Sequence, residues 1–111
     1  MSEKIYVIEV EQAKNKSVFG AAKSLKKALK LIEDDIYGRS SDELKLVMFV
    51  DNLEREEGSA IVIQGESDKV ADKLESNGDT QYVEVKELIY KDDSDNFPIL
   101  SYFTITETEL V

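Results

Sequence analysis

One stretch of sequence decides the fold: Ser24-Leu-Lys-Lys-Ala-Leu-Lys-Leu-Ile-Glu-Asp-Asp-Ile-Tyr-Gly38. Its apolar residues recur at steps of three and four, so they form one stripe along a helix. The residues of this stripe are Leu25, Ala28, Leu29, Ile32 and Ile36. Ser24 is a typical N-cap, and Gly38 is expected to end the helix with a positive φ. Lysines stand at the start and carboxylates at the end of this helix, and this charge order is unfavourable for the helix macrodipole. Packing must therefore stabilise the helix, and contacts of these charged residues outside the helix could explain their order.

Segments rich in β-branched and aromatic residues lie on both sides of this helix and predict strands. The predicted strands are 5–10, 44–50, 60–64, 82–90 and 99–106. Residues 14–17 predict a turn, and residues 18–22 predict either a short return strand or the approach to the helix. A second, shorter helix is expected from an N-cap at Ser67 to a stop at Asn77-Gly78.

The expected order of elements is β-α-β-β-α-β-β, which defines an α+β fold. Two right-handed crossovers joined by a hairpin give a ferredoxin-like βαββαβ sandwich, with both helices on one face of an antiparallel sheet. The extra C-terminal strand is expected to pair with the strand before it, at the edge of the sheet. Residues 42–57 could instead form a helix capped by Ser41, and the fold would remain α+β. With 111 residues, of which 41% are hydrophobic, the chain is expected to be a single domain, residues 1–111.

The composition excludes several kinds of chemistry, because the chain has neither cysteine nor histidine. Disulfides, Cys/His zinc sites, thiolate or imidazole nucleophiles and histidine-ligated haem are therefore ruled out. The serines that could act as nucleophiles stand where caps and turns favour serine. They are Ser17, Ser24, Ser41, Ser59 and Ser67. Among the carboxylates, Glu9 and Glu84 are the first candidates for acid–base work, although solvent-facing sheet positions explain them better. We expect no enzyme and no catalytic residue.

Neither a metal site nor a phosphate site is predicted. The segment Asp92-Asp-Ser-Asp-Asn96 resembles the opening of a calcium loop, but the positions that require glycine and a carboxylate hold Phe97 and Phe103. The glycines are isolated, and no Walker-type Gly-Lys-Ser occurs. Gln64-Gly65-Glu66-Ser67 joins a strand to a helix N-terminus, where amides can hold an anion, but Glu66 and Asp68 would repel one. No cofactor is expected.

The charge of the chain bounds its partners. The net charge of −10 opposes direct binding of nucleic acid or of an anionic membrane surface, and it permits a protein partner with a basic surface. The charge is uneven, since residues 1–40 carry +2 and residues 41–111 carry −12. No secretory signal stands at the start, and no apolar run is long enough to span a bilayer, so a cytoplasmic location is expected.

The carboxylates occur in clusters, and these are the strongest functional signal in the sequence. Carboxylates two residues apart on a strand stand about 6.6–6.8 Å apart on one face, and such an array can imitate a row of phosphates. We therefore expect a small acidic, non-catalytic binding module, of the inhibitor or immunity type, that covers a basic, nucleic-acid-binding surface of a partner protein. The predicted partner-binding residues are Glu54, Glu56, Glu57, Asp92, Asp93 and Asp95.

The alternative is a dimeric regulatory or assembly domain that uses the uncovered face of its sheet, which could also hold a small ligand. Exposed apolar side chains on that face would form the contact of a homodimer. The residues proposed for this patch are Ile5, Val7, Leu88, Tyr82, Tyr90 and Tyr102.

Overall fold

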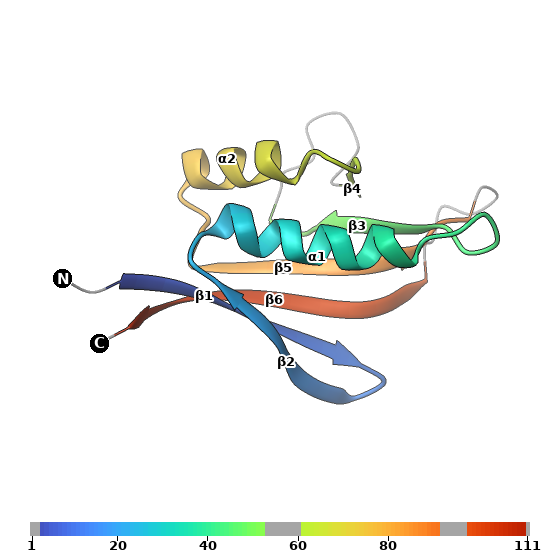
Figure 1. The fold of residues 1–111 in the computed structure, drawn as a ribbon, viewed down its shortest axis with the longest axis horizontal. Helices are drawn as coiled ribbons and strands as arrows, with labels where there is room; N and C mark the ends of the chain where they lie inside the picture. Colours follow the sequence, from blue (N-terminus) through green and yellow to red (C-terminus); the bar gives the residue numbers. More distant parts are fainter. Residues whose placement is uncertain (1–2, 53–60, 92–97, 111) are drawn as a thin grey trace.

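The computed structural model describes residues 3–52, 61–91 and 98–110, which form one antiparallel sheet and two helices (Figure 1). The elements in chain order are β1 (Glu3–Gln12), β2 (Asn15–Ala22), α1 (Leu25–Arg39), β3 (Leu46–Val50), β4 (Ile61–Val62), α2 (Ser67–Asn77), β5 (Tyr82–Ile89) and β6 (Ile99–Leu110). The α+β class is thus confirmed. None of the helices in the described ranges is long and apolar enough to cross a membrane.

The order of strands differs from the ferredoxin-like prediction. The six strands lie in the order β2-β1-β6-β5-β3-β4, and every neighbouring pair is antiparallel. The extra strand β6 does pair with β5, but it lies in the middle of the sheet, between β1 and β5, and not at the edge. Only the coarser prediction, an antiparallel sheet with two helices, holds.

The strand β2 explains this difference. The turn is made by Ala13 and Lys14, both with positive φ, and residues 15–22 form a full return strand that pairs along β1. The predicted turn at 14–17 therefore lies too late in the chain. β2 brings the chain back to the end of the sheet where β1 starts. Helix α1 then runs to the opposite end, so β3 starts where β1 ends and runs antiparallel to β1. A parallel crossover from β1 to β3 is excluded by this direction, and the position beside β1 is open to β6.

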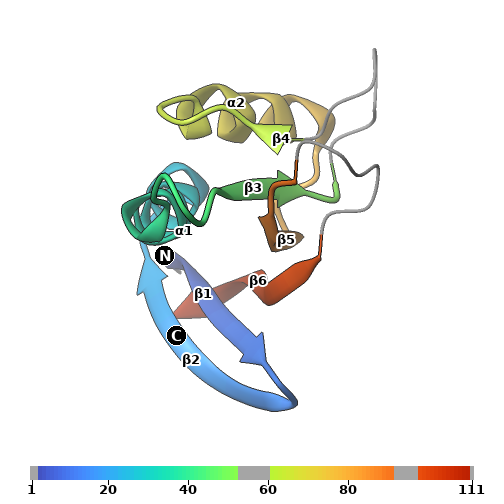
Figure 2. The ribbon, with the colours of Figure 1, turned by 90° about the vertical axis from the view of Figure 1, so that its right-hand side faces the viewer.

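Helix α1 lies in the concave face of the curved sheet, and α2 packs mainly against α1 (Figure 2). The apolar stripe of α1 is buried as predicted, against inward side chains that include Ile8, Met48, Phe103 and Ile105. However, Gly38 does not end the helix, since α1 continues to Arg39 and Gly38 has no positive φ. The second stop is correct, because Gly78 caps α2 with φ of 76°.

The ambiguous segment 42–57 contains strand β3, as the preferred interpretation had it, and its residues 53–57 lie outside the described ranges. The predicted strand at 60–64 is reduced to Ile61–Val62 in the part of the chain that the structure describes.

Candidate functional site

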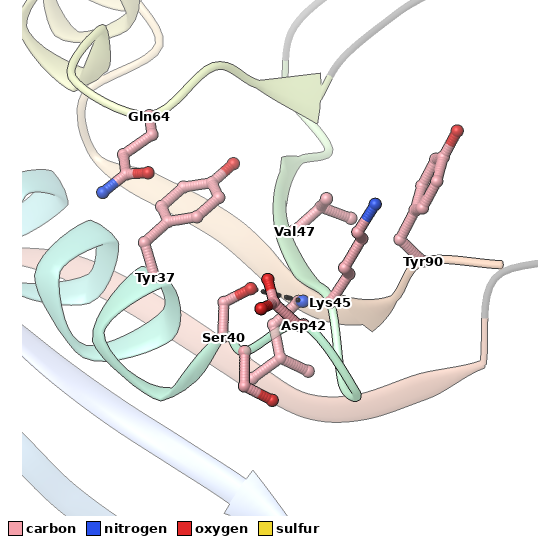
Figure 3. Close-up of a pocket in the computed structure, with 9 residues that line it drawn as sticks. Tyr37, Ser40, Asp42, Lys45, Val47, Gln64 and Tyr90 are labelled. Atoms are coloured by element: carbon pink, nitrogen blue, oxygen red, sulfur yellow. Dashed lines mark hydrogen bonds between the residues drawn. The ribbon is translucent and has the colours of Figure 1, made fainter. Parts of the chain in front are cut away.

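A hollow of about 470 Å³ opens where α1 ends, between the start of β3 and the connection from β4 to α2 (Figure 3). Tyr37 and Gln64 stand on one side of it, and Lys45 and Tyr90 stand on the other. Asp42 lies between them, beside Ser40. The hollow therefore brings together polar groups from four separate parts of the chain.

Tyr37 forms a wall of the hollow and holds three elements together. Its hydroxyl donates to the backbone carbonyl of Val62 on β4, and it accepts from the backbone N–H of Met48 on β3 at 3.4 Å. Burial is the main cause that raises the pKa of this phenol. A hydroxyl that is protonated and engaged in this way positions α1 against the sheet and is not free to act on a ligand.

The two serines of the hollow are also engaged within the fold. Ser40 Oγ accepts from the N–H of Leu46 at 3.2 Å, and Ser41 Oγ accepts from the N–H of Leu44 at 3.1 Å. These bonds shape the connection from α1 to β3, as the prediction for Ser41 expected. Ser24 likewise caps α1, with its Oγ accepting from the N–H of Lys27 at 3.1 Å. What the hollow offers to a ligand is thus the carboxylate of Asp42, the amine of Lys45 and the side-chain amide of Gln64.

The start of α2 is capped by a carboxylate from the other helix. Glu33 is buried, and its Oε1 accepts from the N–H groups of Gly65 at 2.8 Å and Ser67 at 3.2 Å, while Oε2 pairs with Lys30 Nζ at 3.2 Å. Ser67 is therefore not the N-cap that the sequence predicted, since it is the first helical residue and is itself buried. The anion that a helix N-terminus attracts is supplied here by the chain itself.

This contact also accounts for the reversed charge order along α1. Glu33 serves the N-terminus of α2, and Asp35 pairs with Arg39 at 2.8 Å. Lys26 near the start of the helix pairs with Asp72 of α2 at 3.5 Å. Contacts with other parts of the same molecule thus explain most of the reversed charge order along α1.

A second buried carboxylate lies on β5, and the sequence analysis did not single it out. Glu87 is fully buried and accepts from both terminal nitrogens of Arg39, with Nη2 at 2.8 Å from Oε1. The carboxylates of Glu87 and Asp35 raise the pKa of Arg39, with the hydrogen bonds to Glu87 as the main cause. The signal that could have found Glu87 was the alternation itself, because position 87 shares a face with Val83 and Val85.

The two glutamates that were first candidates for acid–base work lie on the face of the sheet away from the helices. Glu9 and Glu84 both pair in register with Thr104, on either side of it. Glu84 is exposed, and Glu9 lies 3.7 Å from Lys16. They are solvent-facing sheet positions, as the sequence indicated.

The six predicted partner-binding residues lie outside the described ranges. Glu54, Glu56 and Glu57 belong to residues 53–60, between β3 and β4, and the three aspartates belong to residues 92–97, between β5 and β6. Within the described ranges, no group of three or more carboxylates is arranged to hold a metal ion.

Comparison with known proteins gives no relative to reason from: no protein-family model, no curated protein and no solved structure matches this chain.

Proposed function

We propose that this chain is a small acidic, non-catalytic binding module, of the inhibitor or immunity type, that covers a basic, nucleic-acid-binding surface of a partner protein. The observation that carries this proposal is where the charge lies along the chain. Residues 53–60 and 92–97 hold six carboxylates and one arginine, so these two short connections carry half of the net charge of −10. A concentrated charge of one sign speeds association with a surface of the opposite sign.

The roles of other carboxylates support this assignment. Glu33 caps α2, Glu87 holds Arg39, and Glu107 joins β6 to Tyr6 and Thr80. Each of these carboxylates has a partner within the fold, which explains its presence without a ligand. The proposal therefore rests on the carboxylates that are concentrated along the two connections.

The groups that could have supported catalysis argue in the same direction. The hydroxyls of Tyr37, Ser40 and Ser41 are engaged with backbone groups. Nucleophilic catalysis needs a hydroxyl or amine beside a base, and the chain has no imidazole, which is the base that enzymes use most often.

Capture from lysate of the native host at low and high salt tests the proposal. We expect the wild-type chain to retain a protein partner at low salt and to release it as the salt concentration rises. Two charge-neutral variants are compared: E54Q/E56Q/E57Q and D92N/D93N/D95N. At least one should weaken binding of the captured partner about tenfold, because charge pairs at an interface steer and hold the complex.

The matched control is E43Q/E75Q/E109Q, which removes the same charge from exposed positions in the described ranges. It should change the affinity much less than either cluster variant. Equal loss in the control and cluster variants, or binding that is unaffected by salt, would contradict the proposal.

A second candidate is a homodimer formed through the face of the sheet that the helices leave uncovered. Tyr82 and Tyr102 point to that face, with 50% and 44% of their surface exposed, and Val7 lies in the same row as Tyr82, both paired with Thr106. Leu88, by contrast, is only 6% exposed and has little surface to contribute. Analytical ultracentrifugation of wild type and Y82S/Y102S decides this candidate. A dimer that the double variant dissociates supports it, and a monomer at high concentration removes it.

A further inference from the structure

The two edges of the sheet are protected to different degrees. Within residues 3–52, 61–91 and 98–110, β4 at one edge has two residues, whereas β2 at the other edge runs over eight residues and has β1 as its one paired strand. Counted from the two-residue turn, the alternation of an antiparallel ladder directs the backbone N–H and C=O groups of Lys16 and Val18 away from β1. These groups form an open edge to which a further strand can bind.

Apolar surface lies on both sides of this edge. On the side away from the helices, Val18 is 70% exposed. On the helix side, Phe19 and Ala22 pack partly against the core, and Figure 2 shows the end of β2 passing beside α1. Leu31 of α1 is 44% exposed, and by the helical period it lies opposite the side that carries the contacts with α2. A strand laid along β2 would therefore cover the apolar groups on the helix side with one of its faces, and its other face would lie on the side of Val18.

The charged residues around the edge of β2 indicate what kind of strand could bind there. Residues 13–32 contain six lysines and no carboxylate, although the whole chain has 24 carboxylates and only 14 basic residues. Three of these lysines form ion pairs: Lys16 with Glu9, Lys26 with Asp72, and Lys30 with Glu33 and Asp34. Lys14, Lys23 and Lys27 are exposed and flank β2 or the adjoining turn of α1.

Lysines at a sheet edge ordinarily keep copies of a protein from pairing with one another. Here they would repel a second β2 strand, and they would attract a strand that carries carboxylates. At physiological ionic strength the Debye length is about 8 Å. In a molecule 51 Å long, a strand against β2 therefore senses the charges close to this edge, which are these lysines together with Glu9 and Glu11 on β1, more strongly than charges farther away.

We propose that the open edge of β2 binds an acidic, extended segment of a partner protein as a seventh strand of the sheet. Alternate side chains of this segment are apolar and face Leu31 and Phe19, and carboxylates lie near Lys14, Lys23 and Lys27. This surface is distinct from the acidic connections, so it gives the chain a second binding site of opposite charge.

The test uses the full chain and two blocked ten-residue peptides, one in which valine alternates with glutamate and one in which valine alternates with lysine. We expect the glutamate peptide alone to bind, and saturation to slow hydrogen exchange of the Lys16 and Val18 amides more than tenfold. Protection that appears at β4 instead, or equal binding of the two peptides, would overturn the proposal. Self-association of the chain through β2 without peptide would assign the edge to a second copy.

Variants separate the backbone and charge contributions. V18P removes one outward N–H and should weaken peptide binding more than tenfold, whereas V18A keeps that N–H and should weaken it less than threefold. K14Q/K23Q/K27Q should weaken binding at least fivefold relative to K45Q/K73Q/K91Q, which removes the same charge elsewhere. If V18P does not fold, exchange at Lys16 and Val18 in the wild-type chain still decides the matter.

Discussion

Glu107 shows how much a single residue can join in this molecule. Its Oε2 accepts from Tyr6 Oη of β1 at 2.9 Å and from Thr80 Oγ1 before β5 at 3.2 Å, and its Oε1 lies 3.2 Å from Lys4 Nζ. The hydrogen bond from Tyr6 is the main cause that lowers the pKa of Glu107. Burial, together with the Glu107 carboxylate, raises the pKa of Tyr6 to about 12.

These pKa shifts give the contact a definite pH dependence. The lowered pKa of Glu107 means that its contribution to stability is present above the unfolded value of about 4.3 and is lost as the pH falls through the folded value. The raised pKa of Tyr6 means that its contribution is present below pH 10 and is lost as the pH rises towards 12.

We predict that Y6F lowers the free energy of unfolding by about 1 kcal/mol at pH 7, since it removes a hydrogen bond to a carboxylate. The difference from wild type should shrink as the pH falls below about 4.3, the ordinary pKa of a glutamate, and through the lowered pKa of Glu107. Urea denaturation between pH 3 and pH 9 measures this. Y82F is the matched control, because Tyr82 is half exposed, and it should change stability by less than 0.5 kcal/mol, roughly the limit for surface changes. A constant difference across this pH range would disprove the coupling to Glu107.

The β1–β2 hairpin is the element that decides the topology, and its turn is made by unfavourable residues. Ala13 has φ of 48° and Lys14 has φ of 72°, a region in which residues other than glycine and asparagine are strained. Ala13-Lys14 stands where a two-residue turn favours Asn-Gly, so the sequence gives no signal for this turn. Pairing along β1 must hold this turn in place, which is why the sequence alone located it imprecisely.

Replacing the turn by the favoured pair, A13N/K14G, should raise the free energy of unfolding by about 1–2 kcal/mol, because both residues then adopt positive φ at lower cost. A13V should destabilise the chain, since a β-branched residue is poorly suited to positive φ. Chemical denaturation of both variants gives the measurement, read from the midpoint at unchanged slope. A stabilising A13V, or no gain in the double variant, would show that the hairpin does not have this turn.

At the scale of the whole molecule, both helices, five predicted strands and the α+β class followed from periodicity and from the cap at Ser24. The ferredoxin-like order did not follow. Residues 18–22 could form a return strand or the approach to the helix, and the return strand reverses the direction of all later strands relative to β1. Burial of apolar residues was likewise predictable, and strand alternation places Glu87 on the same face as Val83 and Val85. The partners of Glu33 and Glu87 were not predictable, since a carboxylate becomes buried only where a partner from a distant element meets it. The prediction for the six acidic residues in the two connections stays a prediction.

The amino-acid sequence by itself determined the local states of this chain and the chemistry it lacks, because helix periodicity, strand alternation and the absence of imidazole and thiol are properties of neighbouring residues or of composition. Only the tertiary structure decided which strands are neighbours, which edge stays open and which carboxylates are satisfied internally. Those outcomes depend on contacts between residues far apart in the chain, such as Glu33 with Ser67 and Arg39 with Glu87, and no local pattern encodes them.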